Sequence, residues 1–564
     1  MTTVNTYSGQ KYECSQTSII YCKESNDDAT DTMSEVIADA CSEIINGILA
    51  GAITRKNLQN VKIDISKRFG LSLLLSNSQI YNAADPHKRK LLQEVLQRKP
   101  VRTASGVAVI AVMTSPHPCP HGRCVPCPGG PPFDTPQSYT GLEPAAKRGM
   151  QHEYDPYKQV RARLDQLQQI GHPIDKAELI VMGGTFTARD LDYQEWFIRR
   201  CLDAMNDFPN EHEYTLGFQF LGSALKQNES AKIRNVGITF ETRPDFSRID
   251  HVDRMLGLGG TKVELGVQSV DDSVLQEINR GHTVAASIEA NRACRDSGLK
   301  VGFHIMPGLP GSDIDSDLKM FKALFREEQF CPDYLKIYLT LVTEGTKLHE
   351  LWAMGKYKQI ELSDGIELVA SVKRILPKWV RLQRVQRDIP ANKIISGVTK
   401  GNLRQLARER LTELGGICQC IRCREIGLKY ITEVDEIELN MLKYRASGGV
   451  EYFISFDGIK DDVEALIGFT RLRFPGQPHR PEIDHNTALI RELHVYGGMV
   501  NLGEEPTRQW QHRGFGSKLL RKAEEIAIDA GKDKLCVTSA VGVRQYYRRH
   551  GYELEGPYMT KSLS

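Results

Sequence analysis

The sequence predicts an α/β protein in which a partial parallel (β/α)6 barrel is preceded by a helical region and followed by a smaller α/β domain. Between residues 107 and 342, short β-branched runs alternate with helical stretches, as they do in successive βαβ units. Unusual residues, among them a group of cysteines, follow the ends of these runs, where barrels gather their chemistry. Beyond residue 450, a strand, a glycine turn and a helix come in succession, which predicts the second domain.

Length and composition set the expected domain organisation. A chain of 564 residues with a net charge of +2 has room for roughly two to four domains. The first 40 residues are acidic and polar, and no basic start followed by an apolar stretch indicates a signal peptide. No run of about 18 apolar residues indicates a membrane span. The expected parts are a disordered arm (1–30), a basic helical region (31–103), the barrel (104–370), a basic linker region (371–449) and the C-terminal domain (450–564).

Two basic segments stand out in this near-neutral chain. Residues 51–103 carry eleven Lys or Arg against three acidic residues, and residues 372–410 carry eleven against two. One such cluster alone would be a solvated face, but two of them favour a polyanion partner, with RNA as the leading candidate. The densest runs of the first segment are 87–90 and 98–102, and the second segment includes Arg381, Arg384, Arg387 and Arg404.

Thirteen cysteines in close groups argue for a reducing compartment, the cytoplasm, and for metal chemistry instead of disulfides. Cys119, Cys124 and Cys127 fall within nine residues of a loop rich in Pro and Gly, directly after the first predicted strand. Three thiols hold a four-iron cluster from one side and leave one iron open for a cofactor such as S-adenosylmethionine. A structural zinc loop without its fourth ligand explains the spacing of the cysteines equally well.

The later strand ends favour the cluster. The second strand is followed by Gly183, Gly184 and Thr185, the third by a run that contains Arg243, and the fourth ends in Gln268. A Pro- and Gly-rich run (307–311) follows the fifth. The predicted strands are Val107–Thr114, Glu178–Gly183, Asn235–Glu241, Lys262–Gln268, Lys300–Met306 and Tyr334–Leu341.

In this order, the motifs resemble the radical S-adenosylmethionine superfamily and, from about residue 50 to the C-terminus, the Elongator protein 3 family. The resemblance implies that Cys119, Cys124 and Cys127 ligate a [4Fe-4S] cluster whose fourth iron binds S-adenosylmethionine. It also implies that Gly183, Gly184 and Thr185 contact the amino group of this cofactor, and that Arg243 and Gln268 contact its carboxylate and ribose. Two features depart from the superfamily pattern: four residues separate the first two cysteines, and Pro126 stands where an aromatic residue is usual.

The C-terminal domain carries an independent signal. A predicted strand at Ile490–Tyr496 is followed by a glycine turn and a helix, and glycines before a helix let backbone amides bind a pyrophosphate. With the strand Lys534–Ser539 that follows, this order resembles the Gcn5-related N-acetyltransferase (GNAT) fold, which binds acetyl-CoA. By that resemblance Tyr547, or its neighbour Tyr546, protonates the departing thiolate, and Glu492 and His494 are candidate bases. The pyrophosphate would be bound by Gln511, His512, Arg513, Gly514, Phe515, Gly516 and Ser517.

Cys418, Cys420 and Cys423 form a second close group, between the two halves. The Cys-x-Cys-x2-Cys spacing predicts structural zinc, with a second iron–sulfur cluster as the alternative. No fourth ligand lies nearby in the sequence, so a His from elsewhere in the fold or a water molecule is expected to complete the site.

A radical domain joined to an acetyl-transfer domain suggests chemistry at an unactivated carbon. The hypothesis is that a radical formed on the acetyl methyl group adds to a pyrimidine double bond, and that thioester hydrolysis leaves a carboxymethyl group. The resemblance to the Elongator protein 3 family implies that this pyrimidine is the wobble uridine of tRNA, modified at C5. An anticodon-loop base is single-stranded and can be splayed into a pocket, where Lys336 and Tyr338 are candidate contacts. The resemblance leaves a second copy of the chain or other Elongator-type subunits as further partners.

Two other functions remain open from the sequence. One is a protein (histone) lysine acetyltransferase with the radical domain as a scaffold, although basic segments suit a cationic histone tail poorly. The other is a tRNA-binding assembly protein with two degenerate sites, against which the intact cysteines and glycine turn argue.

Overall fold

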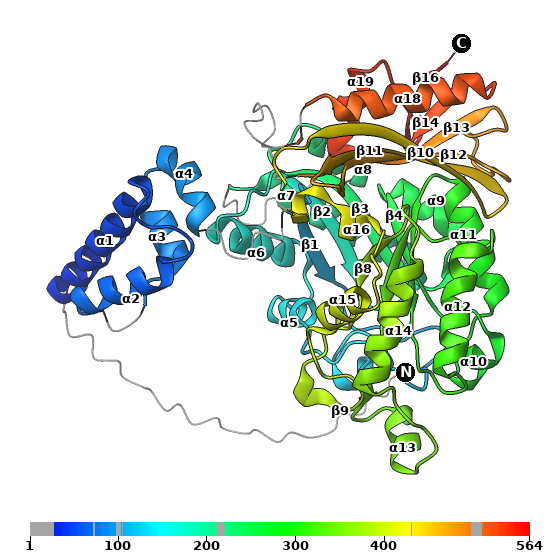
Figure 1. Ribbon diagram of the computed structural model, residues 1–564, viewed down its shortest axis with the longest axis horizontal. Coiled ribbons are helices and arrows are strands. Elements are labelled where there is room, and N and C mark those ends of the chain that lie inside the picture. The colour runs from blue at the N-terminus through cyan, green and yellow to red at the C-terminus, as the bar shows by residue number, and fades with distance from the viewer. Residues whose placement is uncertain are drawn as a thin grey trace, which may run out of the picture. The chain divides into compact units, whose positions relative to one another are not determined.

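The computed structural model describes residues 27–71, 74–96, 103, 105–210, 220–429, 431–497, 510–511 and 513–563 (Figure 1). It divides into two compact units, Met1–Gln97 and Arg98–Ser564. The predicted arm lies outside the described residues as far as residue 26, and its last residues belong to the first helix, which begins at Asp27. His512 and the basic run 98–102 also lie outside the described residues.

The first unit is a small helical bundle, as the apolar spacing predicts. Its helices pack Ile44, Ile80 and Leu92, all fully buried, into a core of their own. The Ser76 side chain accepts a hydrogen bond from the Gln79 backbone amide, and Gln79 reciprocates, so that a capping box begins the third helix. The helices are α1 (Asp27–Leu49), α2 (Leu58–Arg68), α3 (Asn77–Ala83) and α4 (Pro86–Leu96).

The larger unit contains a parallel seven-stranded sheet in the order β1-β2-β3-β4-β5-β6-β8, which confirms the partial barrel. Six strands match the predicted runs, although β6 ends at Ile337 instead of Leu341. The seventh strand comes from the second basic segment, where its sequence Arg-Leu-Gln-Arg gave no apolar signal. The strands are β1 (Ala108–Met113), β2 (Lys176–Met182), β3 (Arg234–Thr242), β4 (Lys262–Gln268), β5 (Lys300–Ile305), β6 (Tyr334–Ile337) and β8 (Arg381–Arg384).

Helices cover the outer face of this sheet and share one core with it (Figure 1). Phe240 of β3 and Phe303 of β5 are fully buried in that core. A two-stranded sheet of β7 (Val342–Thr343) and β9 (Ile394–Ser396) lies apart from the strands of the barrel. The helices are α5 (Pro144–Gln151), α6 (Pro156–Gln169), α7 (Leu191–Asp207), α8 (Leu221–Asn228), α9 (Ile249–Gly257), α10 (Asp272–Glu277), α11 (Val284–Asp296), α12 (Ile314–Arg326), α13 (Lys347–Ala353), α14 (Leu362–Ile375), α15 (Leu403–Glu413), α16 (Ile421–Arg424) and α17 (Ile426–Lys429).

A second seven-stranded sheet, in the order β10-β11-β12-β13-β14-β16-β15, forms the C-terminal domain and begins inside the predicted linker. Its one parallel pair joins Thr487–Ile490 of β13 to Lys534–Val537 of β14. Beyond Ile490, β13 continues without β14, so the two strands separate there. The elements are β10 (Glu436–Ala446), β11 (Gly449–Lys460), β12 (Val463–Phe474), β13 (Thr487–Val495), α18 (Phe515–Asp529), β14 (Lys534–Val537), α19 (Arg544–Arg548), β15 (Glu553–Glu555) and β16 (Tyr558–Ser562).

Buried charges join the two sheets, and we call them the interface lattice. Asp333, just before β6, accepts two hydrogen bonds from the guanidinium of Arg491 in β13, at 2.7 and 2.9 Å. Glu451 of β11 receives the same arginine at 2.8 Å and Arg295 of α11 at 2.9 Å. The lattice consists of Arg295, Asp296, Asp333, Glu451, Arg471, Arg473 and Arg491, none of whose side chains is more than 1% exposed.

The lattice lies at the N-terminal ends of the barrel strands, and so do other contacts of the second sheet. His494 of β13 meets the backbone carbonyl of Ser105, which precedes β1, at 2.9 Å. Lys176, the first residue of β2, donates to Gln511 at 3.3 Å. The cysteine loop follows the opposite, C-terminal end of β1. The two predicted sites therefore belong to opposite ends of the barrel strands.

The interface lattice gives a stability prediction. Asp333→Asn keeps the shape of the side chain but removes the negative charge that faces Arg295, Arg471 and Arg491. Breaking a buried ion pair in this way costs about 3–5 kcal/mol. We therefore expect a lower thermal unfolding midpoint for the barrel and second sheet together, measured by calorimetry. Asp529→Asn, at the exposed end of α18, is the control and should leave the midpoint unchanged; equal midpoints for both variants would contradict the prediction.

Candidate functional site

A cavity of about 360 Å³ opens at the C-terminal ends of the barrel strands. Pockets of this size accept small-molecule cofactors. Cys119, Cys124 and Cys127 all line it, which brings the three predicted cluster ligands to one wall. Pro126 lines it as well, in the position where the superfamily usually has an aromatic residue. Of the residues predicted to contact the cofactor, those lining the cavity are Gly184, Thr185, Arg243 and Gln268.

Two of the residues predicted to contact the cofactor, Gly183 and Gln268, have a backbone with positive φ. Gly183 has φ +124°, and a Cβ there would lie 2.1 Å from the Thr114 hydroxyl oxygen, so no other residue fits. Gln268 has φ +70°, a strained conformation for a residue with a side chain. Its Oε1 is buried and has no hydrogen-bond partner among the described residues. A buried acceptor of this kind in a cavity wall is suited to a ligand.

Specific donors surround the three thiols. The Thr185 hydroxyl lies 3.5 Å from the Cys119 sulfur, and the amide of Gln137 donates to Cys127 at 3.0 Å. His121 Nε2 is 3.0 Å from the sulfur of Cys124. Burial and the positive charges of Arg243 and Arg280 lower the pKa of His121 to about 4. Thiolates and sulfides are anionic, so this positive, donor-rich wall fits an iron–sulfur cluster.

Arg243 lines the cavity, and its guanidinium has a carboxylate partner within the protein. Its guanidinium already pairs with both carboxylate oxygens of Asp245, at 2.9 and 2.8 Å, and it is 2% exposed. The charge of Arg243 is therefore balanced within the protein, which leaves it poorly suited to neutralise a cofactor carboxylate.

A charged network at the cavity wall was missed by the sequence analysis apart from Lys336. The Lys336 ammonium bridges Glu241, at 2.8 Å, and Glu264. Glu241 also accepts from the Tyr139 hydroxyl at 3.0 Å, and His304 Nε2 meets Glu264 at 3.0 Å. Burial opposes the charge of Lys336, but Glu241 and Glu264 raise its pKa above the usual range. Lys336 is therefore a fixed cation and a donor, not a base.

Glu241, Glu264 and His304 lie close enough together to hold a metal ion. The ammonium of Lys336 pairs with both carboxylates, so it supplies the positive charge that an ion would bring. The sequence carried one signal for this network: Glu241 and Glu264 are acidic residues within apolar strands whose C-terminal ends reach the cavity.

The second site lies where α18 begins. Gly514, with φ +81°, precedes a helix of 15 residues, whose first amides have no partners within the helix. Gly516 lies in the first turn, and a Cβ there would come within 3.0 Å of the Tyr546 hydroxyl. Ser517 contacts His550 Nε2 at 3.2 Å, and Arg513 lies over the Trp510 ring at 4.9 Å. The turn can therefore present amides and a phenol to a pyrophosphate-bearing ligand.

Tyr547 and Glu492, predicted as catalytic residues of the acetyltransferase domain, have their contacts in buried surroundings. Tyr547 is 5% exposed and packs in the core of the domain beside Tyr552, so Tyr546 is the tyrosine at the glycine turn. Glu492 pairs with Arg471 at 2.8 Å and also accepts from Tyr334. Burial opposes ionisation of Glu492, but Arg471 and Lys300 keep its pKa below the usual value. This carboxylate is an interface residue and a poor base.

His494 and Gln511 are likewise engaged at the barrel. His494 meets the Ser105 carbonyl, as described above. The Gln511 side chain donates to the Val495 carbonyl at 3.2 Å and accepts from Lys176. The described hydrogen bonds of Gln511 therefore go to β13 and β2.

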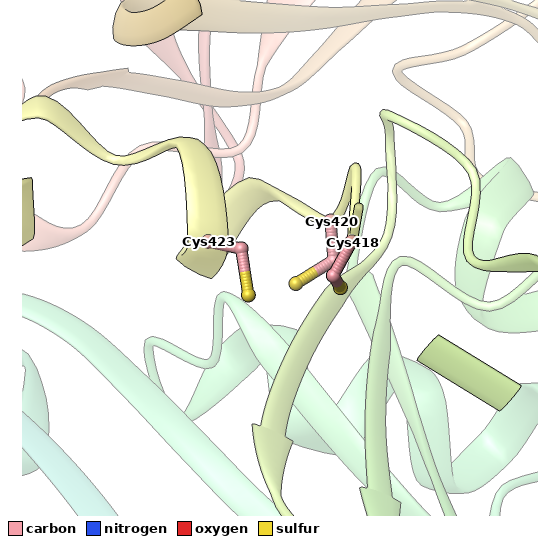
Figure 2. A group of neighbouring side chains, drawn as sticks. All are labelled: Cys418, Cys420 and Cys423. Carbon is pink, nitrogen blue, oxygen red and sulfur yellow. The ribbon is translucent and has the colours of Figure 1, made fainter. Parts of the chain in front are cut away.

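The third group, Cys418, Cys420 and Cys423, converges in space (Figure 2). The three sulfurs lie within 4.8 Å of one another, as three ligands of one ion should. Hydrogen bonds from Cys418 and then Cys423 lower the pKa of Cys420, so the group stabilises a thiolate. No fourth His, Cys, Asp or Glu joins the group among the described residues. Lys373 Nζ lies 3.7 Å from the Cys423 sulfur.

The arginines of the second basic segment lie in two places, the protein interior and the cavity wall. Arg381 pairs with Glu425 at 2.7 Å and donates to the Tyr496 hydroxyl at 2.9 Å. Arg404 donates to the Leu382 carbonyl at 3.2 Å. These two arginines hold β8 in place and do not form the surface that the sequence suggested. Arg384 and Arg387 line the cavity instead.

Models of four protein families match successive parts of the chain. They are the ELP3 N-terminal domain (residues 37–104), the radical SAM superfamily (117–324), the Radical_SAM C-terminal domain (332–413) and the acetyltransferase (GNAT) family (424–552). Together with the cysteine-lined cavity and the glycine turn, they define a radical S-adenosylmethionine protein fused to an acetyltransferase domain. Within the described residues, no helix is long and apolar enough to cross a membrane.

Relatives identify the family. The chain is 48% identical over 523 residues to the tRNA uridine(34) acetyltransferase of Methanocaldococcus jannaschii, covering 91% of this chain and 95% of that one. It is 44% identical over 520 residues to Elongator complex protein 3 of Homo sapiens, covering 90% and 93%. The structure of Methanocaldococcus infernus Elp3 with an N-terminal deletion (1–46) aligns at a TM-score of 0.71 and 46% identity, covering 82% of this chain and 100% of that one. The chain belongs to the Elongator protein 3 family.

The two adjacent tyrosines give a prediction. Tyr546→Phe removes the hydroxyl beside Gly516 and should lower acetyl-CoA turnover about 100-fold or more, as loss of a general acid does. Tyr547→Phe is the matched control, because it removes a hydroxyl from the core, and its turnover should stay within about twofold. Thioester cleavage can be followed by release of free CoA. A larger loss in Tyr547→Phe, with its fold intact by circular dichroism, would reverse the assignment.

Proposed function

We propose that this chain modifies the wobble uridine of tRNA by adding a carboxymethyl group at C5, with acetyl-CoA as the source of the two carbons. The observation that carries the proposal is the cavity in which three cysteines, Gln268 and Gly184 converge at one end of the barrel. The relatives named tRNA uridine(34) acetyltransferase support the substrate. The acetyltransferase domain, held to the same barrel by the interface lattice, supports the acetyl donor.

The cavity residues have distinct roles in the proposal. Cys119, Cys124 and Cys127 would hold the [4Fe-4S] cluster, and Gly184, Thr185 and Gln268 would hold S-adenosylmethionine. Bound together, these cofactors supply a carbon radical that removes a hydrogen atom from an unactivated C–H bond. Lys336, fixed by Glu241 and Glu264, offers a stationary cation to an oxygen of the substrate. Such a preorganised charge does not need to reorient as the reaction proceeds.

At the other end of the barrel strands, the turn before α18 would bind the pyrophosphate of acetyl-CoA. Gly514 and Gly516 let the backbone approach, and the N-terminal end of a helix favours an anion. Burial raises the pKa of Tyr546, which keeps its hydroxyl protonated at neutral pH. A protonated phenol beside the turn can give its proton to the departing thiolate.

The RNA substrate is supported by positive charge on both units. The helical unit exposes Arg55, Lys56, Lys67, Arg68 and Lys88. Arg384 and Arg387 add charge at the cavity, where an anticodon base would enter. Such residues bind phosphates without reading sequence. A base splayed from a single-stranded loop can then be recognised inside the cavity.

For Cys418, Cys420 and Cys423 we propose a structural zinc ion, with the fourth position taken by water. Tetrahedral Zn–S bonds of about 2.3 Å place sulfurs about 3.8 Å apart, which the converging thiols can reach. Lys373 and Arg404 lie near the thiolates and offset their negative charge. The backbone around this group bonds to the β8 segment, through Ile421 N to the Val380 carbonyl at 2.9 Å.

The function can be tested with the whole protein. Anaerobically reconstituted protein is incubated with acetyl-CoA, S-adenosylmethionine, a reductant and unmodified tRNA, and nucleosides are analysed by mass spectrometry. We expect 5-carboxymethyluridine to depend on both cofactors and to fall at least 100-fold in Cys124→Ala. Cys201→Ala, in the core of the barrel, should retain the activity.

Two outcomes would contradict this function. Product formation that survives Cys124→Ala would remove the cluster from the mechanism. Transfer of the acetyl group to a lysine peptide, with no modified tRNA at all, would support the protein acetyltransferase instead.

The metal proposal has its own measurement. Elemental analysis of protein reconstituted without added zinc should find about one zinc per chain, and Cys423→Ser should lose most of it, because two thiolates hold the ion poorly. Cys201→Ala again serves as the control. Iron in place of zinc, retained by a variant of the first loop such as Cys124→Ala, would favour a second cluster.

A further inference from the structure

Arg280 is a cavity residue that neither the sequence analysis nor the family resemblance singled out. It follows α10 and is 9% exposed. Its Nη1 lies 3.6 Å from the sulfur of Cys124, within reach of an N–H···S hydrogen bond. No other arginine among the described residues has a recorded hydrogen bond to a sulfur of Cys119, Cys124 or Cys127.

The position of Arg280 is fixed by the backbone of β4. Its Nη2 donates to the Gly266 carbonyl at 2.6 Å. A Cβ on Gly266 would lie 2.6 Å from the same nitrogen, so a side chain there would displace the guanidinium from this position. The absence of a side chain at Gly266 therefore leaves room for the Arg280 guanidinium beside Cys124.

The charge of Arg280 is not balanced by the protein. Within the part of the chain that the structure describes, no carboxylate forms an ion pair with Arg280, and its Nε has no hydrogen-bond partner. Two other arginines of the same cavity behave differently, because Arg243 pairs with Asp245 and Arg384 pairs with Asp388. An unbalanced buried cation is costly unless an anion comes to it. Its neighbour here is a thiol that becomes anionic when it binds iron.

We propose that Arg280 is a positioning residue that raises the reduction potential of the iron–sulfur cluster, by placing a positive charge and an N–H donor on Cys124. Reduction adds negative charge to the cluster, and a nearby cation stabilises the reduced form more than the oxidised one. Hydrogen bonds to cluster sulfurs act in the same direction. This inference rests on the proposed function in one respect, that the first cysteine loop holds the cluster.

The test is a redox titration of the reconstituted full-length protein, without S-adenosylmethionine, in which electron paramagnetic resonance follows the reduced cluster. Arg280→Gln should shift the midpoint to a more negative potential at unchanged iron and sulfide content. Arg280→Lys, which keeps the charge but not the planar fork, should show a smaller shift of the same sign. Gly266→Ala keeps the arginine but displaces it, and should also shift the midpoint downward.

Arg384→Gln is the matched control, because Arg384 lines the same cavity and has no described hydrogen bond to a cysteine sulfur. Its midpoint should match that of the unsubstituted protein. An unchanged midpoint in Arg280→Gln with a full cluster, or an equal shift in Arg384→Gln, overturns the role of Arg280 and leaves the proposed function standing. If Arg280→Gln assembles no cluster, the other two variants decide, and unchanged midpoints in both overturn the proposal. Failure of the unsubstituted protein to assemble a cluster overturns the proposed function as well.

Discussion

The interface lattice is the interaction on which the arrangement of the larger unit depends. Four arginines and three carboxylates lie away from water between the two sheets, and charges in such a place are tolerated only when each one meets its partners. Asp333 alone faces three of these arginines. A small slide of one sheet over the other would leave several charges unpaired at once. The lattice therefore specifies a single orientation of the acetyltransferase domain on the barrel, whatever its net contribution to stability.

This fixed orientation separates two kinds of chemistry. The cysteines lie where the barrel strands end, whereas β13 and Gln511 contact the barrel where its strands begin. Because each charge of the lattice has its partners across the two sheets, the lattice opposes sliding of one sheet over the other. Strand β6 contributes to both ends of the sheet: the Tyr334 hydroxyl donates to Glu492 of β13, and Lys336, two residues further along, donates to Glu241 of β3 at the cavity.

The parts of the molecule that follow from local pattern were predictable from the sequence. Apolar β-branched runs predicted six of the seven parallel strands, and cysteine spacing predicted both thiol groups. Strand β8 escaped because its arginines are stabilised by distant partners such as Glu425 and Tyr496, which no local pattern reveals. The bridge of Lys336 between Glu241 and Glu264 joins three strands, so the sequence pointed to the separate residues but not to their pairing. Tyr546 and Tyr547 lie next to each other in a helix of five residues, and the sequence does not show which of them faces the glycine turn.

Strand β8 also has a consequence for how the protein is made. Chains emerge from the ribosome N-terminus first, and domains begin to fold as they emerge. The first six strands are complete at Ile337, yet the strand that pairs with β6 is not synthesised until Arg384, and the cysteine group beside it ends at Cys423. During that interval β6 is an unprotected edge, open to pairing with other nascent chains. Arg384 and Arg387, which line the cavity, are likewise added only after the cysteine loop and the first six strands have been made.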